Sequence, residues 1–549
     1  MSSVYTSQKG CDDTGDGTEE KPFKTVVKAL LSIDGDESTT ILVDNTGEDS
    51  STKPFIEISN SQKKKQVKLY QAELRKGKAR EVKEAEDAVK REEVLQEASK
   101  ISISEDASLE PAKEIKLRDC VNHREKRIKA YGWVHNLRRQ GKNMMFIVLR
   151  DGTGYLQCVL SEKLCQTVDA IQLQTEATVL VYGVITEVPE GQHAPGGHEL
   201  ICDFWKVVGH APSGGIESVV TEKSDVDLQL RQKHLVIRWD EHSKALKLRS
   251  AITFCFRQHY FDKGYVEVTP PTMVKTQCEG GSTLFSFDYF GEQAYLTQSS
   301  QLYLETVLPS IGDTFCMAQS YRAEKAKTRR HLSEFTHVEA ECPFITFDQL
   351  LERLEDLVCN VCERILASSF KDMLLEVNPD FKVPKRPFKR MLYTEAIQWL
   401  KDHDIKNEET GQYYEFGEDI PEAPERKMTD AINEPIFLCK FPAGIKAFYM
   451  LRSADDDRLT DSVDLLMPNV GEIIGASMRE YRLDVLMEGY KREEIDPSPY
   501  YWYTDQRKFG TSKSGGYGLG LERFLTWMLN KPHIRDVCLY PRFRERIDP

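Results

Sequence analysis

Between Lys113 and Ala211, apolar and polar residues alternate along four short segments, and this pattern constrains the fold more than any other feature of the 549-residue chain. Turn-forming sequences separate the segments, which run over residues 128–135, 144–150, 155–160 and 179–185. Alternation with a period of two is typical of half-buried β-strands, and several short strands joined by tight turns favour a closed barrel. The sequence therefore predicts a compact five-stranded β-barrel in this part of the chain.

The predicted barrel carries basic and aromatic residues near its first loop. Arg138, Arg139 and Lys142 lie in that loop, and Phe146 and Tyr155 follow it. A basic, aromatic face on a small barrel is typical of proteins that bind single-stranded nucleic acid, because bases stack on the rings and phosphates attract the cations. A structural barrel whose aromatic residues fill the core fits the same pattern, so the pattern alone leaves both interpretations open.

Length and composition exclude several classes of protein. Hydrophobic residues make up 40% and charged residues 30% of the chain, as in soluble globular proteins of roughly three or four domains. No apolar run approaches the ~18 residues of a membrane span and the N-terminus has no secretory signal, so we expect a cytoplasmic protein without a membrane partner. The 13 cysteines form no disulfide framework, and Cys359 and Cys362 lie in an amphipathic helical segment, which predicts buried thiols rather than a zinc site.

The first 112 residues differ in composition from the predicted barrel. Residues 1–60 are acidic and favour a small appended domain, whereas residues 61–100 contain no proline and predict a long exposed helix. Basic residues crowd the first half of this helix, beginning with Lys63, Lys64 and Lys65. Such a strip can contact RNA phosphates without sequence preference, although composition alone favours a solvated helix.

Residues 315–341 combine a strand pattern, a basic loop and a second strand pattern. The chain has no G-x-x-x-x-G-K-S/T loop and no glycine-rich dinucleotide turn, so a nucleotide must be held in another way. Because side chains in a strand repeat every second residue, we expect Arg322 and Glu324 to point in one direction. With His331 and Phe335 in the returning segment, this hairpin offers groups for a phosphate, an amine and a purine ring.

Three segments in the right order resemble the signature motifs of the class II aminoacyl-tRNA synthetases: residues 264–271 resemble motif 1, residues 322–335 motif 2 and residues 518–524 motif 3. The preceding barrel makes the resemblance strongest to the subgroup specific for aspartate, asparagine and lysine. It implies an α+β multidomain fold, in which an antiparallel sheet flanked by helices forms the catalytic domain, after an OB-fold barrel and an N-terminal α/β extension. The implied segments are an appended domain, a basic helical linker, an anticodon-binding OB-fold, a hinge and a catalytic domain, at residues 1–60, 61–112, 113–212, 213–240 and 241–549.

The resemblance also implies which residues bind ATP. Arg322 would bind the α-phosphate, Glu324 the adenine amino group and Phe335 the adenine ring. The other implied ATP-binding residues are Arg330, His331, Leu332, Glu472, Gly520, Leu521, Glu522 and Arg523. No general base is needed because the amino-acid carboxylate is already ionised, so catalysis by Arg322 and Arg523 is positioning and charge stabilisation.

A magnesium site is implied beside the phosphates. Glu472, with Asp464 as a second acid, would hold Mg²⁺, because a hard cation prefers carboxylate oxygen. Relatives often place a metal-binding serine three residues after this glutamate, where this chain has Gly475. We therefore expect reduced direct ligation by the protein there, with water completing the site.

The residues implied for the amino acid are Glu279, Gln298, Gln301, Leu304, Glu339 and Arg479. Glu279 would pair with the α-ammonium and Arg479 with the side-chain carbonyl oxygen. Leu304 stands where aspartate enzymes have a lysine, and Glu339 stands where they have an aspartate. A glutamate accepts a hydrogen bond from an amide but repels a carboxylate, so this pair of residues favours asparagine over aspartate.

The barrel and helix are implied to bind tRNA. Phe146, Gln157 and Glu199 resemble anticodon contacts, and the resemblance makes the basic residues Arg138, Arg139, Lys63, Lys64 and Lys65 further tRNA contacts. The layout is most similar to the cytoplasmic asparaginyl-tRNA synthetases of eukaryotes, which implies a homodimer formed through the catalytic domain. Such an enzyme converts L-asparagine and ATP to asparaginyl-adenylate and pyrophosphate, then charges tRNA(Asn). An aspartyl enzyme and a non-catalytic RNA-binding or signalling relative are the alternatives, whereas a tRNA-independent asparagine synthetase on the same fold would lack the barrel.

Overall fold

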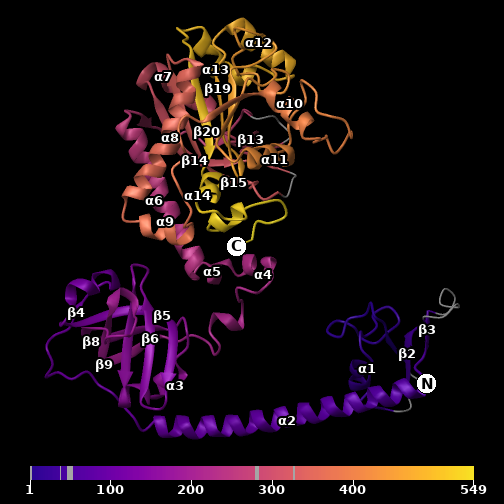
Figure 1. Ribbon diagram of the computed structural model, residues 1–549, viewed down its shortest axis with the longest axis vertical. Helices are drawn as coiled ribbons and strands as arrows, with labels where there is room; N and C mark the ends of the chain where they lie inside the picture. Colours follow the sequence, from indigo (N-terminus) through magenta and orange to yellow (C-terminus); the bar gives the residue numbers. More distant parts are fainter. Residues whose placement is uncertain (1–2, 37–38, 46–53, 279–282, 325–327, 549) are drawn as a thin grey trace. The chain divides into compact units, whose positions relative to one another are not determined.

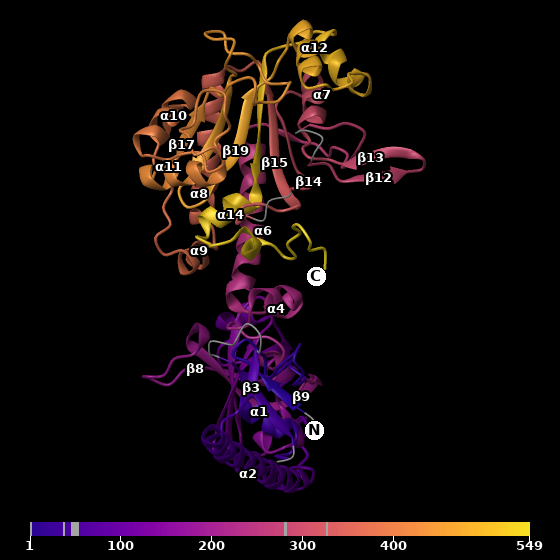
Figure 2. The same ribbon diagram turned by 90° about the vertical axis from the view of Figure 1, so that its right-hand side faces the viewer.

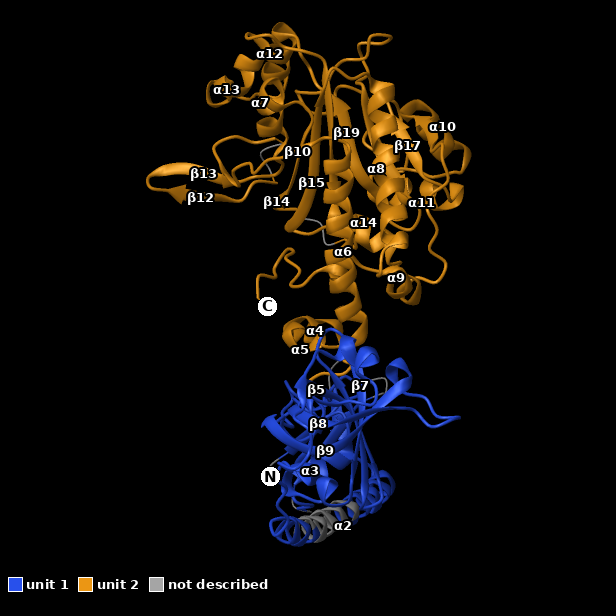
Figure 3. Cartoon of the chain, turned by 90° about the vertical axis from the view of Figure 1, so that its left-hand side faces the viewer, with its two compact units in different colours: residues 1–218 blue, residues 219–549 orange. Residues whose placement is uncertain are grey.

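The computed structural model (Figure 1) describes residues 3–36, 39–45, 54–278, 283–324 and 328–548, except for the side chains of residues 76–89 and 91. The chain divides into two units, residues 1–218 and 219–549 (Figure 3). The boundary falls inside the predicted hinge, which contains the short helices α4 (Val226–Arg231) and α5 (Lys233–Val236). None of the described helices combines the length and the apolar composition that crossing a membrane requires.

A small three-stranded sheet opens the first unit. Strand β2 (Thr40–Asp44) pairs in parallel with β1 (Ser3–Thr6) and antiparallel with β3 (Phe55–Glu57). Helix α1 (Val26–Ser32) and the first turns of α2 (Asn60–Ala98) pack on this sheet through Leu30 and Tyr70. The long helix predicted over residues 61–100 is therefore confirmed, with Lys64 and Lys65 exposed and Lys63 half-buried.

Five strands close the barrel of the first unit. They are β5 (Arg127–Gln140), β6 (Met144–Arg150), β7 (Tyr155–Ser161), β8 (Thr178–Glu187) and β9 (His198–Gly209). Pairing of β5 with β8 closes the order β5-β6-β7-β9-β8, while the two-residue β4 (Lys113–Glu114) lies beside β5 and α3 (Val168–Gln172) precedes β8. Ile128 and Ala130 point into the core, whereas Tyr131 and Trp133 point outward. The alternation thus produced the predicted five-stranded barrel.

An eight-stranded sheet forms the second unit, in the order β10-β14-β15-β20-β19-β18-β17-β16. Its strands are antiparallel except for the pairs β10–β14 and β16–β17. The strands are β10 (Val266–Glu267), β14 (Thr314–Tyr321), β15 (Glu334–Pro343), β16 (Lys389–Leu392), β17 (Ile436–Cys439), β18 (Ser462–Met467), β19 (Gly471–Met478) and β20 (Ser514–Gly520). The strands β11 (Met273–Val274), β13 (Glu292–Leu296) and β12 (Ser286–Tyr289) form a separate small sheet, in that order. Its strands β12 and β13 are seen in Figure 2.

Helices α6 (Asp240–Asp262) and α8 (Phe347–Ala367) pack on one face of the large sheet and bury a common apolar core with it. Helix α8 begins with a capping box in which Thr346 and Gln349 satisfy each other's backbone amides. Cys359 and Cys362 are fully buried on this helix, as predicted. The remaining helices are α7 (Gln301–Ile311), α9 (Lys371–Val377), α10 (Tyr393–Asp402), α11 (Glu422–Ile432), α12 (Leu483–Arg492), α13 (Tyr501–Thr504) and α14 (Leu521–Met528).

The expected strand geometry of Arg322 and Glu324 is wrong. Strand β14 ends at Tyr321, so both residues follow it in an irregular segment. The backbone N–H of Ala323 donates to the carbonyl of Thr283 rather than to β15. Because the chain leaves the β-ladder here, tertiary contacts rather than strand periodicity direct these two side chains.

Candidate active site

A cavity of about 320 Å³ lies over the large sheet and collects most of the predicted site residues. Those that line it are Gln301, Arg322, Glu324, Arg330, His331, Leu332, Phe335, Glu339, Asp464, Glu472, Arg479, Gly520, Glu522 and Arg523. They come from α7, β15, β18, β19, β20 and α14 and from the segments between them. Residues from motif-like segments almost 200 positions apart are thus brought to one space.

Three predicted residues do not line the cavity. Gln298 is buried behind the cavity wall, where its amide accepts from the Cys278 amide at 3.1 Å and donates to the Thr283 hydroxyl at 2.8 Å. Leu304 is fully buried and Leu521 nearly so, and neither lines the cavity. Glu279 lies outside the described residues.

Strand β15 explains why the cavity is polar although it stands on a hydrophobic core. Val338, Ala340 and Cys342 pack in that core, whereas the alternate residues His337 and Glu339 line the cavity on the other face. The period of two places Glu341 on the same face as Glu339. One strand therefore supplies both the apolar floor and the charged wall.

Two arginines that line the cavity are held by carboxylates. The Arg330 Nη1 lies 2.8 Å from the Glu425 Oε1, and the Arg523 Nη1 lies 2.9 Å from the Glu472 Oε2. Burial raises the pKa of Glu425 to about 7 even though Arg330 opposes the shift. Burial also disfavours the Glu472 anion, yet Arg523 and Arg330 outweigh it and lower the pKa of Glu472 to about 2. Of these two acids, only Glu472 has its pKa shifted below the ordinary value.

Aromatic and cationic groups adjoin where Arg322 and Phe335 line the cavity. The Arg322 guanidinium carbon lies 5.5 Å from the centroid of the Phe335 ring. His331 contacts the Thr328 hydroxyl at 2.7 Å, and burial, reinforced by Arg523 and Arg330, lowers the pKa of His331. A planar base with an attached phosphate matches this pairing of a ring face with positive charge.

Glu522 lines the cavity, but its carboxylate already has protein partners. Its oxygens accept from the Arg249 guanidinium at 2.7 Å and from the Thr336 amide at 3.0 Å. The side chain therefore links α14 to α6 and β15. Glu522 thus has a structural contact in addition to its predicted role in ATP binding.

Two carboxylates that suit a divalent cation face each other across Gly475. A Cβ atom on Gly475 would lie 3.3 Å from the Glu472 Oε1 and 3.7 Å from the Asp464 Oδ1. Lys446 pairs with Asp464 at 2.9 Å, while burial raises the pKa of Asp464 to about 6. The oxygen donors fit a hard cation such as Mg²⁺, although among the described residues no group of three or more His, Cys, Asp or Glu side chains could hold a metal.

Around Glu339 and Arg479, the cavity is lined by a buried network of charges. The Glu339 carboxylate accepts from the Ser300 amide at 2.9 Å and from the Ser299 hydroxyl. Arg479 donates through two nitrogens to Glu341, with 3.1 Å between Nε and Oε2, and through Nη1 to the Ser477 hydroxyl at 2.7 Å. Both Glu339 and Arg479 are thus fixed before any ligand enters.

Sequence reasoning missed several cavity residues and their partners. Lys446 and Tyr449 enter the cavity from the segment between β17 and β18, and Glu425, on α11, is the partner of the lining residue Arg330. Neither segment has a motif or a spacing that points to the cavity. Glu341 was open to prediction, because it stands two residues after Glu339 on the same strand face.

The predicted anticodon face of the first unit also forms a surface hollow. Arg138, Arg139, Phe146 and Gln157 line it. The Arg138 guanidinium carbon lies 4.8 Å from the Phe146 ring centroid, and the Gln157 amide donates to Glu199 at 2.8 Å. Arg139 instead turns its guanidinium toward the backbone carbonyl of Ala170.

Comparisons with known families match three parts of the chain. The family described as tRNA synthetases class II (D, K and N) matches residues 225–544. An asparaginal-tRNA synthetase N-terminal domain matches residues 18–110, and an OB-fold nucleic acid binding domain matches residues 128–208.

Individual relatives match over most or all of the chain. The cytoplasmic asparagine--tRNA ligase of Homo sapiens is 60% identical over 550 residues, and that of Saccharomyces cerevisiae is 47% identical over 564 residues, each match covering 100% of both chains. The asparaginyl-tRNA synthetase of Entamoeba histolytica, solved in complex with asparaginyl-adenylate, is 45% identical with a TM-score of 0.76, over 80% of this chain and 100% of its own. The chain therefore belongs to the class II aminoacyl-tRNA synthetases of the aspartate, asparagine and lysine subgroup and, within it, to the asparaginyl-tRNA synthetases.

Proposed function

We propose that this chain activates L-asparagine with ATP, releases pyrophosphate, and transfers asparagine from the adenylate to tRNA(Asn). The observation that carries the proposal is one cavity that joins Arg322 and Phe335 to Glu339 and Arg479. Its volume of about 320 Å³ is in the range of small-molecule sites. A group at one end suits a nucleotide and a group at the other suits an amino acid, so the space between them is where the two would react.

In the first step, a carboxylate oxygen of asparagine attacks the α-phosphorus of ATP and pyrophosphate leaves. Arg322 would stabilise the negative charge that develops on the α-phosphate, while Phe335 holds the base. In the second step, a terminal ribose hydroxyl of tRNA attacks the carbonyl carbon of the adenylate and AMP leaves. Oriented binding and fixed positive charge supply the catalysis in both steps.

Glu472 and Asp464 are the residues that we propose for Mg²⁺. When bound, the cation would neutralise charge on the ATP phosphates. Lys446 holds Asp464 in place, and Arg523 holds Glu472. Each carboxylate thus keeps a fixed orientation toward Gly475.

A screen of the twenty amino acids in ATP–pyrophosphate exchange tests the function. We expect turnover with asparagine and little response to aspartate, because Glu339 accepts from an amide but repels a carboxylate. Equal turnover of the two amino acids would indicate the aspartyl alternative or a relaxed site. The absence of exchange with any amino acid would instead favour a non-catalytic relative.

We propose that the barrel reads the tRNA anticodon. Phe146 offers a stacking face beside Arg138, and the pair formed by Gln157 and Glu199 offers donors and acceptors to base edges. The exposed Lys64 and Lys65 on α2 would add contacts to phosphates without sequence preference. Lower salt dependence of tRNA binding after removal of these lysines is the expected result.

A homodimer formed through the second unit is also proposed. Large apolar side chains are exposed on α6, β10 and β11, in the part of the chain that includes the motif 1-like residues 264–271: Phe254, Phe261, Val266 and Met273. Exposed apolar surface of this kind marks interaction sites. Light scattering of the purified chain should give twice the 63.0 kDa mass, and a monomeric mass at micromolar concentration would contradict the proposal.

Finally, we propose a cytoplasmic location, because the curated relatives that match the full chain are named cytoplasmic. Microscopy of a fluorescently tagged chain tests this, and enrichment in an organelle would contradict it.

A further inference from the structure

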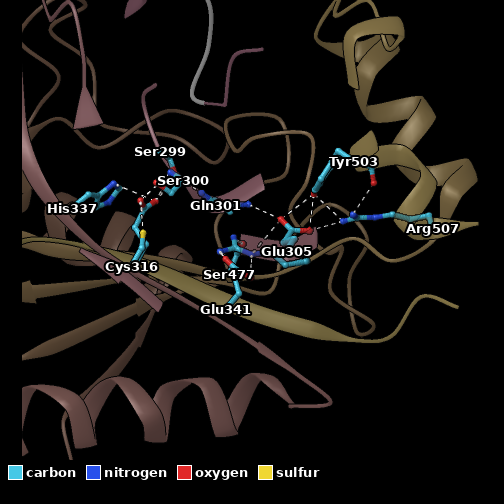
Figure 4. A network of polar contacts seen from close by, with 12 residues as sticks. Ser299, Ser300, Gln301, Glu305, Cys316, His337, Glu341, Ser477, Tyr503 and Arg507 are labelled. Carbon is cyan, nitrogen blue, oxygen red and sulfur yellow. Dashed lines mark hydrogen bonds and ion pairs between the residues drawn. The ribbon is translucent and has the colours of Figure 1, made fainter. Parts of the chain in front are cut away.

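A buried polar network lies behind the amino-acid end of the cavity (Figure 4). Gln301 and Glu305 stand four residues apart on α7, so they share a helix face, and both are almost fully buried. Gln301 lines the cavity, whereas Glu305 does not. The proposed function gives Glu305 no role, although burial of a carboxylate is unfavourable without strong compensation.

Glu305 has that compensation from three side chains. Its Oε2 lies 2.8 Å from the Arg507 Nη2 and accepts from the Tyr503 hydroxyl at 2.9 Å. Its Oε1 accepts from the Gln301 Nε2 at 3.1 Å. Arg507 is held in turn by the Glu480 carbonyl at 3.0 Å and lies 4.1 Å from the Tyr503 ring centroid. The carboxylate is therefore fixed from the side that faces away from the cavity.

The contact with Glu305 determines which way the Gln301 amide points. An ionised carboxylate can only accept hydrogen bonds, so the amide nitrogen of Gln301 must face Glu305. The amide oxygen then remains as the acceptor that Gln301 offers to a ligand. An oxygen acceptor suits an ammonium group and disfavours a carboxylate.

Glu305 also approaches Arg479, whose Nε lies 4.0 Å from the Glu305 Oε1. Arg479 is already held by Glu341 and Ser477. One buried carboxylate thus contacts one cavity residue and lies beside another, each proposed to touch a different part of the amino acid.

We propose that Glu305, supported by Arg507 and Tyr503, is a positioning residue that fixes the Gln301 amide oxygen toward the α-ammonium of asparagine. The inference rests on the proposed function, because it requires the amino acid to bind at this end of the cavity. It assigns Glu305 to recognition of the backbone of the substrate rather than of its side chain.

Glu305→Gln tests the inference. The oxygen of the new amide would accept from Arg507, and its NH₂ group would then face Gln301. Gln301 would turn its own nitrogen toward the cavity and meet the ammonium with a donor. We expect the asparagine KM in pyrophosphate exchange to rise about tenfold, as for loss of a hydrogen bond to a charged group, with kcat and the ATP KM changed less than about threefold.

Succinamate, which is asparagine without its α-ammonium, separates positioning from general damage. Its inhibition constant against asparagine should stay within about twofold of the wild-type value in Glu305→Gln, because it has no ammonium to misplace. A parallel rise of the succinamate inhibition constant and the asparagine KM would overturn the proposal, as would an unchanged asparagine KM.

Two further variants complete the test. Tyr503→Phe removes one donor to Glu305 and should raise the asparagine KM by about threefold, without changing the succinamate inhibition constant. If Glu305→Gln does not fold, this variant tests the proposal in its place. Asp313→Asn breaks an ion pair of 2.8 Å with Arg353 outside the cavity and should change neither constant. Lack of asparagine-dependent exchange in the wild type would refute the proposed function. If the wild type is active but the variants shift the asparagine KM and the succinamate inhibition constant equally, this inference alone is refuted.

Discussion

Gly471→Ala should disturb ATP binding through a contact that the structure defines closely. Gly471 has a φ of +82°, and a Cβ atom there would lie 2.8 Å from the Arg330 Nη1 and 3.0 Å from the Glu425 Oε1. These two atoms form the 2.8 Å ion pair that holds Arg330 in the cavity lining. Side-chain ends can move, so the methyl group would separate the pair rather than prevent folding.

Two terms set the size of the effect. Placing a residue with a Cβ atom at this positive φ costs about 1–2 kcal/mol. Loss of a hydrogen bond between charged groups adds about 1.5–3 kcal/mol. The backbone cost lowers only the stability of the fold, whereas loss of the hydrogen bond also releases the Arg330 side chain. If the release of Arg330 weakens ATP binding by about 1.4 kcal/mol, which is the lower end of the second contribution, the ATP KM rises about tenfold.

Gly510→Ala provides the matched control. Gly510 has a φ of +84°, and apart from its two chain neighbours no described residue has a heavy atom within 4 Å of the place that a Cβ atom would take, so only the backbone term applies. Urea unfolding should show a loss of stability in both variants, larger in Gly471→Ala, and pyrophosphate exchange should show a raised ATP KM only in Gly471→Ala. An unchanged ATP KM in Gly471→Ala would refute the predicted role of Arg330 in ATP binding.

Three substitutions test the other assigned sites. Phe146→Ala should lower kcat/KM for tRNA(Asn) roughly ten- to a hundredfold without changing pyrophosphate exchange, because stacking of one base contributes about 1–3 kcal/mol; equal losses in both assays would contradict an anticodon role. Gly475→Ser should reduce the Mg²⁺ concentration for half-maximal exchange severalfold by adding an oxygen beside Glu472, and no change would place the cation elsewhere. Arg322→Ala should lower kcat for exchange about 10²–10³-fold, and near-normal exchange would exclude its role in charge stabilisation.

The sequence predicted those parts of the structure that local pattern determines. Alternation of Ile128 and Ala130 with Tyr131 specified a barrel strand, since a shift of one residue would expose the core. The order of the three motif-like segments specified the catalytic sheet. Local pattern failed at Arg322, because strand β14 has ended and the backbone N–H of the next residue, Ala323, donates to the distant Thr283.

The partners that hold the site residues were not open to prediction in the same way. Glu425 and Arg507 belong to short helical segments. From the sequence, a charged residue in such a segment is expected to be exposed to solvent. Their burial follows from contacts with Arg330 and Glu305, which are 95 and 202 residues away in the sequence. No spacing within either segment records such a contact, so only the tertiary structure reveals it.

The structure also changes the physical basis for preferring asparagine to aspartate. Leu304, predicted to stand where aspartate enzymes have a lysine, is fully buried and does not line the cavity. It would therefore favour asparagine only because it lacks the positive charge of a lysine. Glu341 binds Arg479 through two nitrogens, which leaves that guanidinium charge largely compensated. An incoming carboxylate would therefore meet Glu339 without a full counterion, and two like charges about 4 Å apart repel by about 4 kcal/mol at an effective dielectric constant of about 20. An amide meets no such repulsion and donates to Glu339, so we infer that selectivity comes from the balance of the buried charges around the cavity.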